Sequence, residues 1–213
     1  MLKLIQTVLC LALTSAPFAS SRADPITVVV ISTNLGKMTV ALDANRAPIT
    51  VANFLAYVDE EAYDGTIFHR VIDDFMIQGG GYRVDLSETP EKGPITNEAE
   101  NGLSNAVGTI AMARSNLIDS ATRQFFINLV DNSRLDHKPN SCTRENEQRA
   151  LELAERGLVK PNRCASYGYA VFGSVQNGLD VVERIAKSKT KQQGEFFDVP
   201  TEPVIILSIR REG

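Results

Sequence analysis

Short runs of β-branched and aromatic residues, each ended by turn residues, constrain the fold of this chain more than any other feature. Residues 26–31 and 37–42 flank an Asn-Leu-Gly turn, so they predict a β-hairpin. We expect further strands at 66–72, 75–78, 107–113, 124–130, 169–172 and 203–209. Many short strands favour a β-barrel or a β-sandwich, and periodicity alone does not distinguish these folds.

Two segments have apolar residues at helical spacing. The first begins at Pro48, which suits the first turn of a helix because no N–H group is required there. The second lies shortly before the last strand. The apolar positions are Val51, Phe54, Leu55 and Val58 in the first helix and Leu179, Val182, Ile185 and Ala186 in the second. Two amphipathic helices beside many strands favour a β-barrel that the helices plug.

A polar and strongly helical segment at 143–157 breaks this pattern. Thr143 is a candidate N-cap, and Gly157 is a candidate C-terminal stop. We interpret about 138–166 as an insertion in a surface loop of a single domain that covers 24–213.

The first residues have the three-part layout of a secretory signal peptide. Lys3 precedes an apolar run at 4–13, and small residues follow it. We expect cleavage of residues 1–23, after Ala23 or less favourably after Ala19, and therefore a periplasmic or secreted protein. The alternatives are an uncleaved anchor and a frayed first helix. No second apolar stretch is long enough to cross a membrane.

The cysteines agree with export. Cys10 would leave with the signal peptide, so Cys142 and Cys164 would remain as a pair in an oxidising compartment. We expect a disulfide between them, at the base of the insertion. The alternative is two free buried thiols.

Charge excludes some partners. The chain has 22 Lys and Arg against 26 Asp and Glu, a net charge of −4. Loss of the signal peptide removes Lys3 and Arg22 and leaves 20 basic residues, a net charge of −6. A chain this acidic is not expected to bind nucleic acid or an anionic membrane.

No metal site is predicted. His69 and His137 are the only histidines, and the acids near them lack metal-ligand spacing. On a strand, His69 would point away from its neighbour Arg70, so we expect a packed structural residue. The glycines at 79–81 are not followed by the Gly-Lys-Ser/Thr of a phosphate loop, and we interpret them as a close turn.

The densest group of informative residues lies at 68–81. Alternate strand residues share a face, so Arg70 points with Phe68 and Ile72, and Met76 points with Gln78. One arginine and one glutamine among apolar side chains are typical of a groove for a small ligand or a peptide. Without further motifs, a solvated or ion-paired arginine is the alternative.

Further motifs along the chain favour the groove over that alternative. Segment 68–81 resembles the signature of the cyclophilin family, and Gly-Thr-Ile-Ala-Met-Ala at 108–113, Gln-Phe-Phe-Ile-Asn at 124–128 and Tyr-Ala-Val-Phe-Gly at 169–173 follow in the family's order and spacing. The resemblance spans about 28–209, interrupted by the insertion. Its three consecutive glycines and its Leu-Asp-His at 135–137 are most similar to the bacterial periplasmic branch.

The resemblance implies a mainly β fold: a closed, eight-stranded antiparallel barrel capped by two α-helices, with the active groove outside and the insertion as an added surface helix. It also implies a peptidyl-prolyl cis-trans isomerase with Arg70 as the catalytic residue. The groove residues that it implies are Phe75, Met76, Gln78, Ala113, Arg114, Gln124, Phe126, Leu135 and Tyr169.

Roles within this groove also follow from the resemblance. The proline pocket would consist of Phe75, Met76, Phe126 and Leu135, and Gln78 and the backbone of Arg114 would hold the substrate main chain. Three positions depart from the family pattern: Arg134 replaces a tryptophan that contacts cyclosporin in many members, Tyr169 replaces a rim histidine, and Asp73-Asp74 replaces a Pro-Gly turn.

The chemistry fits these residue types. Rotation about an X–Pro bond has a barrier of about 20 kcal/mol because the C–N bond has partial double-bond character. No bond breaks, so no nucleophile, metal or cofactor is required. A permanently charged guanidinium beside an apolar wall can stabilise the twisted amide more than either planar isomer. We therefore expect Arg70 to act on proline-containing segments of exported proteins, in a monomer.

Two other classes of function remain open. One is a non-catalytic chaperone or adaptor that grips proline-containing segments. The other is an interaction protein that acts mainly through the inserted helix.

Overall fold

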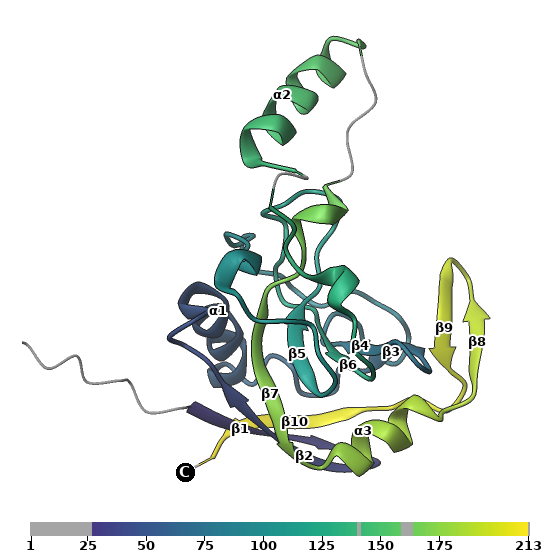
Figure 1. Ribbon diagram of the computed structural model, residues 1–213. Helices are drawn as coiled ribbons and strands as arrows, with labels where there is room; N and C mark the ends of the chain where they lie inside the picture. The colour runs from purple at the N-terminus through teal and green to yellow at the C-terminus, as the bar shows by residue number, and fades with distance from the viewer. Residues whose placement is uncertain (1–26, 140–141, 159–163, 213) are drawn as a thin grey trace, which may run out of the picture.

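The computed structural model describes residues 27–139, 142–158 and 164–212 (Figure 1). The predicted signal peptide, 1–23, lies outside the described residues. The strands are β1 (Thr27–Thr33), β2 (Gly36–Leu42), β3 (Phe68–Ile72), β4 (Met76–Gly79), β5 (Thr109–Met112), β6 (Phe125–Asn128), β7 (Val171–Asn177), β8 (Thr190–Gln193), β9 (Phe196–Pro200) and β10 (Ile206–Arg211). The helices are α1 (Pro48–Asp59), α2 (Arg144–Glu155) and α3 (Leu179–Ala186), with short 3₁₀ turns η1 (Ala99–Asn101), η2 (Ser133–Leu135) and η3 (Ala165–Tyr167).

Eight strands form one antiparallel sheet in the order β10-β1-β2-β7-β5-β6-β4-β3. The protein is therefore mainly β, and all the strands expected from the sequence belong to this sheet. In the described part of the chain, no helix has the length and apolar character needed to cross a membrane.

The prediction of a closed barrel is wrong, because the sheet is open between its edge strands β3 and β10. Between these edges lie one bridge, Ile67 with Ile205, and hydrogen bonds from the Gly65 N–H to the Ile206 carbonyl (2.9 Å), from the Ile206 N–H to the Thr66 carbonyl (2.8 Å) and from the Phe68 N–H to the Val204 carbonyl (2.9 Å). The rest of β10 pairs with β1, so contact with the β3 edge is limited to the short segment that ends at Ile206. The sheet is curved, but its ladder of hydrogen bonds is not continuous.

Aromatic packing fills the core inside the curved sheet. The Phe54 ring of α1 lies 5.3 Å from that of Tyr63, 5.7 Å from that of Phe125 and 5.2 Å from that of Phe172, measured between centroids. Burial of each such ring stabilises the fold by roughly 2–3 kcal/mol. Helix α3 adds Val182, Ile185 and Ala186 to the same core, so both amphipathic helices predicted from the sequence are confirmed, although Leu179 is exposed.

A distant carboxylate caps α1. Pro48 stands at the start of the helix as predicted, but the N-cap residue Ala47 has no side chain that could accept a hydrogen bond. Glu98 accepts hydrogen bonds from the N–H groups of Ile49 (3.1 Å) and Thr50 (2.8 Å) and from the Thr50 hydroxyl (2.7 Å). Its negative charge also suits the positive end of the helix dipole.

The hairpin of β8 and β9 is a feature that the sequence analysis did not predict. Every residue of β8 is exposed, so this strand has no apolar face that would produce an alternating pattern. Strand β9 lies against β3, and its Phe196 ring contacts the Tyr82 ring at 5.0 Å. The hairpin is therefore fixed by tertiary contacts of β9.

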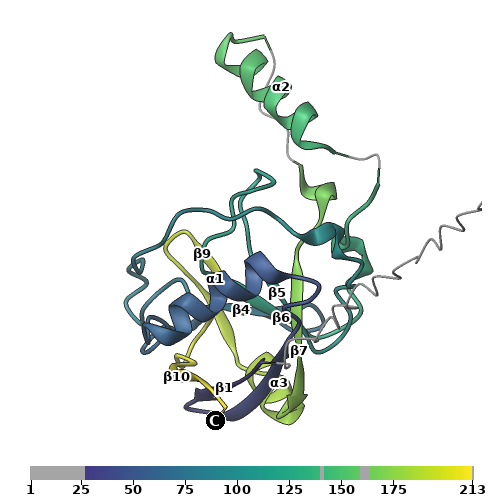
Figure 2. The same cartoon turned by 90° about the vertical axis from the view of Figure 1, so that its left-hand side faces the viewer.

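The inserted helix is present as α2 and projects away from the strands in both views (Figures 1 and 2). The Thr143 hydroxyl accepts a hydrogen bond from the Asn146 N–H (3.2 Å), which confirms the predicted N-cap. Gly157 has a φ of 71°, so it ends the helix in the left-handed region that favours glycine. No side chain of α2 is buried.

A disulfide, an ion pair and several hydrogen bonds anchor this insertion at its base. Cys142 and Cys164 are joined by a disulfide with a Cα–Cα distance of 5.7 Å. The Arg144 guanidinium pairs with the Asp119 carboxylate (2.7 Å), and Glu147 accepts a hydrogen bond from the backbone of the same loop. Among the described residues, those of α2 beyond this base are not buried.

Reduction of the disulfide should destabilise the protein. The bridge spans a sequence separation of 22 residues, for which loop entropy corresponds to about 3 kcal/mol. We expect a lower melting temperature with reductant, measured by circular dichroism, and faster proteolysis within the insertion. An identical melting curve and cleavage pattern would contradict this role.

Candidate active site

A cavity of about 140 Å³ opens on the outer face of the sheet. The residues that line it come from β3, β4 and the turn between them, from β6, from η2, from the loop after β5 and from the segment before β7. They are Arg70, Phe75, Met76, Gln78, Ala113, Arg114, Phe126, Leu135 and Tyr169. The structure thus brings together all the site residues predicted from the sequence except Gln124.

Strand register places Arg70, Gln78 and Phe126 in one row across the sheet. Arg70 pairs with Gln78 between β3 and β4, Gln78 pairs with Phe126 between β4 and β6, and Phe126 pairs with Ala111 of β5. Residues that are directly opposite each other share a face of the sheet. The guanidinium, the amide and the phenyl ring therefore lie side by side across neighbouring strands.

The floor of the cavity is apolar. Met76, Phe126 and two smaller side chains form a buried cluster, against which Phe75, Leu135 and Tyr169 pack while partly exposed. The rings of Phe126 and Tyr169 meet edge to face at 5.7 Å. This cluster is separate from the main core, so the groove has its own apolar packing.

Gln124 lies beside the cavity and not in its wall. Its Oε1 accepts a hydrogen bond from Gln78 Nε2 (3.0 Å), and it lines an adjoining cavity of about 310 Å³ that also includes Ala113. Gly81 makes room for this side chain, because a Cβ at 81 would lie 2.6 Å from Gln124 Cδ. The lack of a side chain at Gly81 therefore leaves space for Gln124 beside the groove.

The two histidines lie outside the cavity. His69 is buried, with its ring edge to face with that of Tyr82 at 4.7 Å, as expected for a packed structural residue. Burial, and next the positive charge of Arg70, lower the pKa of His69 to about 4, so its ring is neutral at physiological pH. His137 Nδ1 lies 2.7 Å from the Tyr167 carbonyl. Among described residues, no group of His, Cys, Asp or Glu could hold a metal ion.

Sequence reasoning missed the asparagines behind the pocket. Asn132 Nδ2 donates to the Phe75 carbonyl (2.9 Å) and to Asn128 Oδ1 (2.9 Å), and Asn105 Nδ2 donates to Asp136 (2.9 Å). These bonds hold the turn before Phe75 and the segment around η2 in place. The signal available in the sequence was Asn128, a polar residue at the end of an apolar strand. The structure shows that it is fully buried, where a polar side chain needs hydrogen-bond partners.

A buried arginine was missed as well. Arg123 donates hydrogen bonds to the carbonyls of Gly80 (2.7 Å), Pro90 (2.6 Å) and Ala62 (2.5 Å), and its guanidinium lies over the Tyr57 ring at 5.0 Å. It fixes the glycine turn at one end of the groove. Its partners are backbone groups far along the chain, which no side-chain motif could indicate.

A larger cavity of about 400 Å³ lies along β2 and β7. Asp43, Asn45 and Ser104 are among its polar residues, and none of the described residues lining it is a lysine or arginine. It therefore lacks the permanent cation that distinguishes the smaller cavity. The chemistry favours the smaller one as the active site.

Comparison with known families agrees with this geometry. A family model described as cyclophilin type peptidyl-prolyl cis-trans isomerase/CLD matches residues 28–211. The chain belongs to the cyclophilin family. It is a peptidyl-prolyl cis-trans isomerase, like the curated proteins that it resembles over most of its length.

These relatives are bacterial. The chain is 40% identical to peptidyl-prolyl cis-trans isomerase A of Dickeya dadantii, over 97% of this chain and 94% of that protein. It is 43% identical to an isomerase of Acinetobacter baylyi (90% and 88% covered) and 42% identical to isomerase B of Escherichia coli (85% and 98% covered). A crystal structure of a Cryptosporidium parvum cyclophilin shares the fold, with a TM-score of 0.62 at 20% identity, over 89% of this chain and 99% of that one.

Arg134, at the position where the resemblance implies a tryptophan in many members, lies beside the cavity. The guanidinium carbon lies 4.7 Å from the centroid of the Phe75 ring, and the residue is exposed. A charged, flexible side chain thus covers one wall residue of the groove. A family tryptophan would present a flat indole with one N–H donor there.

Cyclosporin should therefore inhibit this cyclophilin only weakly. Replacement of Arg134 by tryptophan should lower the inhibition constant about tenfold or more, because a well-packed aromatic contact with one hydrogen bond is worth at least about 1.4 kcal/mol. Inhibition of turnover by cyclosporin can be compared between the native protein and Arg134→Trp, with Arg149→Trp on α2 as the control. Tight inhibition of the native protein would show that position 134 does not control affinity.

Proposed function

We propose that this cyclophilin accelerates the isomerisation of X–Pro bonds in exported proteins, with Arg70 as its catalytic residue. The observation that carries the proposal is the row of Arg70, Gln78 and Phe126 across β3, β4 and β6, at the mouth of an apolar cavity. A cation, an amide and an aromatic floor there are the groups that a twisted prolyl amide requires.

The apolar walls would receive the proline ring. Met76 and Phe126 form the buried floor, and Phe75 and Leu135 form partly exposed sides. Gln78 donates its Nε2 hydrogen to Gln124, which leaves Gln78 Oε1 to accept a hydrogen bond from a substrate N–H. A peptide bound in this way presents its prolyl amide to the Arg70 side of the cavity.

Arg70 would act on the amide itself. In the twisted form the prolyl nitrogen becomes pyramidal and regains a lone pair, to which a guanidinium N–H can donate. The guanidinium could also anchor the prolyl carbonyl. The nearby apolar surface excludes water and strengthens this electrostatic contact, so the twisted form gains more than either planar isomer. One related solved structure, 21% identical with a TM-score of 0.60, was determined in the presence of the dipeptide Ala-Pro.

The exported location is supported by two separate features. One is the signal-like pattern at 1–23, and the other is the disulfide between Cys142 and Cys164, because disulfides persist in oxidising compartments. The substrates would then be proteins that fold after crossing the membrane.

Removal of the guanidinium should abolish most of the activity. Arg70→Ala should reduce kcat on an Ala-Pro test peptide by about 100- to 1,000-fold, the effect of removing one transition-state donor. Arg149→Ala, on the exposed face of α2, is the matched control. Circular dichroism should show an unchanged fold for both variants. A normal kcat in a folded Arg70→Ala variant would refute the catalytic role of Arg70, whereas no turnover in the native protein would favour a binding protein.

Export makes a separate prediction. The full chain expressed in a Gram-negative host should reach the periplasm, lose residues 1–23 and resist alkylation at both remaining cysteines until it is reduced. Mass spectrometry of the periplasmic fraction measures all three, and a chain without residues 2–23 is the control. Free thiols in the fractionated protein would count against both the disulfide and the exported location.

A further inference from the structure

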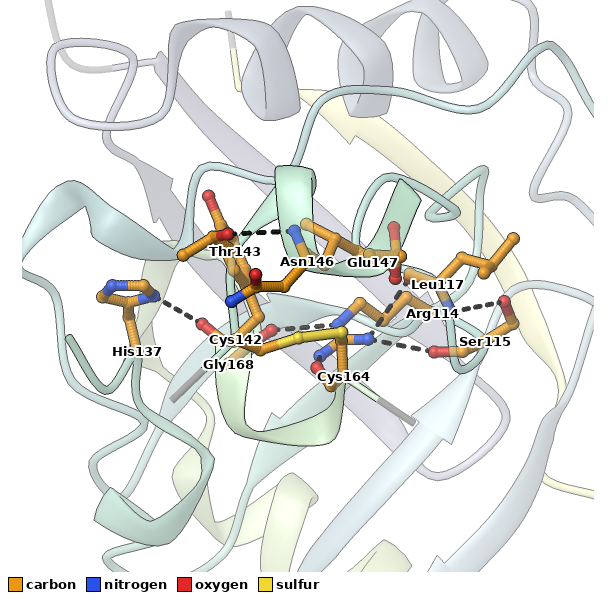
Figure 3. Close-up of a disulfide and its surroundings, with 12 residues drawn as sticks. Arg114, Ser115, Leu117, His137, Cys142, Thr143, Asn146, Glu147, Cys164 and Gly168 are labelled. Atoms are coloured by element: carbon orange, nitrogen blue, oxygen red, sulfur yellow. Dashed lines mark hydrogen bonds between the residues drawn. A yellow bond between two sulfur atoms is a disulfide. The ribbon is translucent and has the colours of Figure 1, made fainter. Parts of the chain in front are cut away.

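The side chain of Arg114 lies beside the disulfide between Cys142 and Cys164 and makes hydrogen bonds around it (Figure 3). Its Nε donates to the Gly168 carbonyl (2.9 Å), and its Nη2 donates to the Cys164 carbonyl (2.7 Å). Its Nη1 donates to the carbonyls of Ser115 (3.1 Å) and Leu117 (3.3 Å). One guanidinium therefore ties together the loop after β5, the end of the insertion and the segment before β7.

The same guanidinium forms part of the groove wall. Its central carbon lies 4.8 Å from the centroid of the Tyr169 ring, and both residues line the cavity. On its other side, Tyr169 contacts Phe126, and its backbone N–H donates to the Leu135 carbonyl (3.0 Å). Because the Tyr169 ring is partly exposed, core packing alone does not fix its orientation. The stacked guanidinium supplies the missing constraint.

The carbonyls that hold Arg114 are themselves fixed. Cys164 is fully buried and bonded to Cys142, in a small apolar cluster that also contains Ile118. Gly168 has a φ of 98°, and a Cβ there would lie 2.5 Å from the His137 backbone nitrogen, so only glycine fits. The disulfide and this close approach together set where the acceptors of Arg114 lie.

We propose that Arg114 is a positioning residue, which transmits the geometry of the disulfide-anchored insertion to Tyr169 and thereby sets how tightly the groove holds its peptide. The inference rests on the proposed function of the groove. It assigns to the insertion a local role in substrate affinity, through one side chain. Arg70 lies on β3, apart from these contacts, so the effect falls on KM and leaves kcat near its native value.

Lysine cannot replace this arginine. A guanidinium presents five N–H donors in a rigid plane, which here reach carbonyls in three directions while the flat face stacks on an aromatic ring. A lysine has one nitrogen and cannot make these contacts together, although it keeps the charge. Arg114→Lys therefore removes the link without removing a positive charge from the groove.

The test measures KM and kcat separately for Arg114→Lys, for the double variant Cys142→Ser with Cys164→Ser, and for the three substitutions combined. An assay without a coupling protease is needed, because a loosened insertion could be cleaved. We expect Arg114→Lys to raise KM about threefold to tenfold with kcat changed less than twofold, within the range of coupling between contacting residues. The cysteine variant should raise KM by less, and the combination should not exceed Arg114→Lys alone.

Controls keep the outcome decisive. Arg149→Lys, on the exposed part of α2, should leave KM unchanged. If the cysteine variant does not fold, reduction and alkylation of the native protein replaces it in the comparison. An unchanged KM in Arg114→Lys, a loss of kcat at constant KM, or additive effects in the combined variant would overturn the inference. Arg70→Ala in the same assay separates the two proposals, since normal turnover in that variant refutes the proposed function instead.

Discussion

Every residue of β6 is buried, because this strand is covered on both faces. Its inward side chains, Phe125 and Ile127, belong to the main core, and its outward Phe126 belongs to the apolar cluster of the groove. Strand β6 also pairs with β4 on one side and β5 on the other. The same hydrogen-bond ladder therefore holds the core together and sets the register of the groove. A shift by one residue would exchange the two faces and destroy both.

Period-two alternation explains why much of the site was predictable from sequence. Gln78 and Phe126 occupy strand positions whose faces follow from counting residues, and the apolar side chains around them identify that face as a groove. The count fails at Phe68, which was expected to share the face of Arg70 but lies in the main core, because the register of β3 shifts between these two residues. The cap at Thr143 and the stop at Gly157 were equally local signals, and the structure confirms both. Features fixed within a few residues of sequence can be predicted without knowledge of the fold. The order of family motifs then supplied the overall architecture.

The features that were missed depend on partners far along the chain. Glu98 caps α1, and Arg123 bonds carbonyls in three separate segments, so the sequence displays the donors and acceptors without their pairing. The opening of the sheet also depends on distant residues, because it follows from the pairing of β10 with β1. Strand β8 was missed for a different reason, since four exposed polar residues give no alternation. The position of Gln124 beside the cavity also required the structure.

The base of the insertion has a consequence for how such a chain can change. The Cα atoms of Cys142 and Cys164 are 5.7 Å apart, so the chain leaves the body of the protein and returns at almost the same point. An intervening segment of any length satisfies that boundary condition, and each doubling of its length costs only about 0.6 kcal/mol in closure entropy. This position should therefore tolerate insertions: a longer helix or a complete foreign domain could replace α2 while the sheet kept its register.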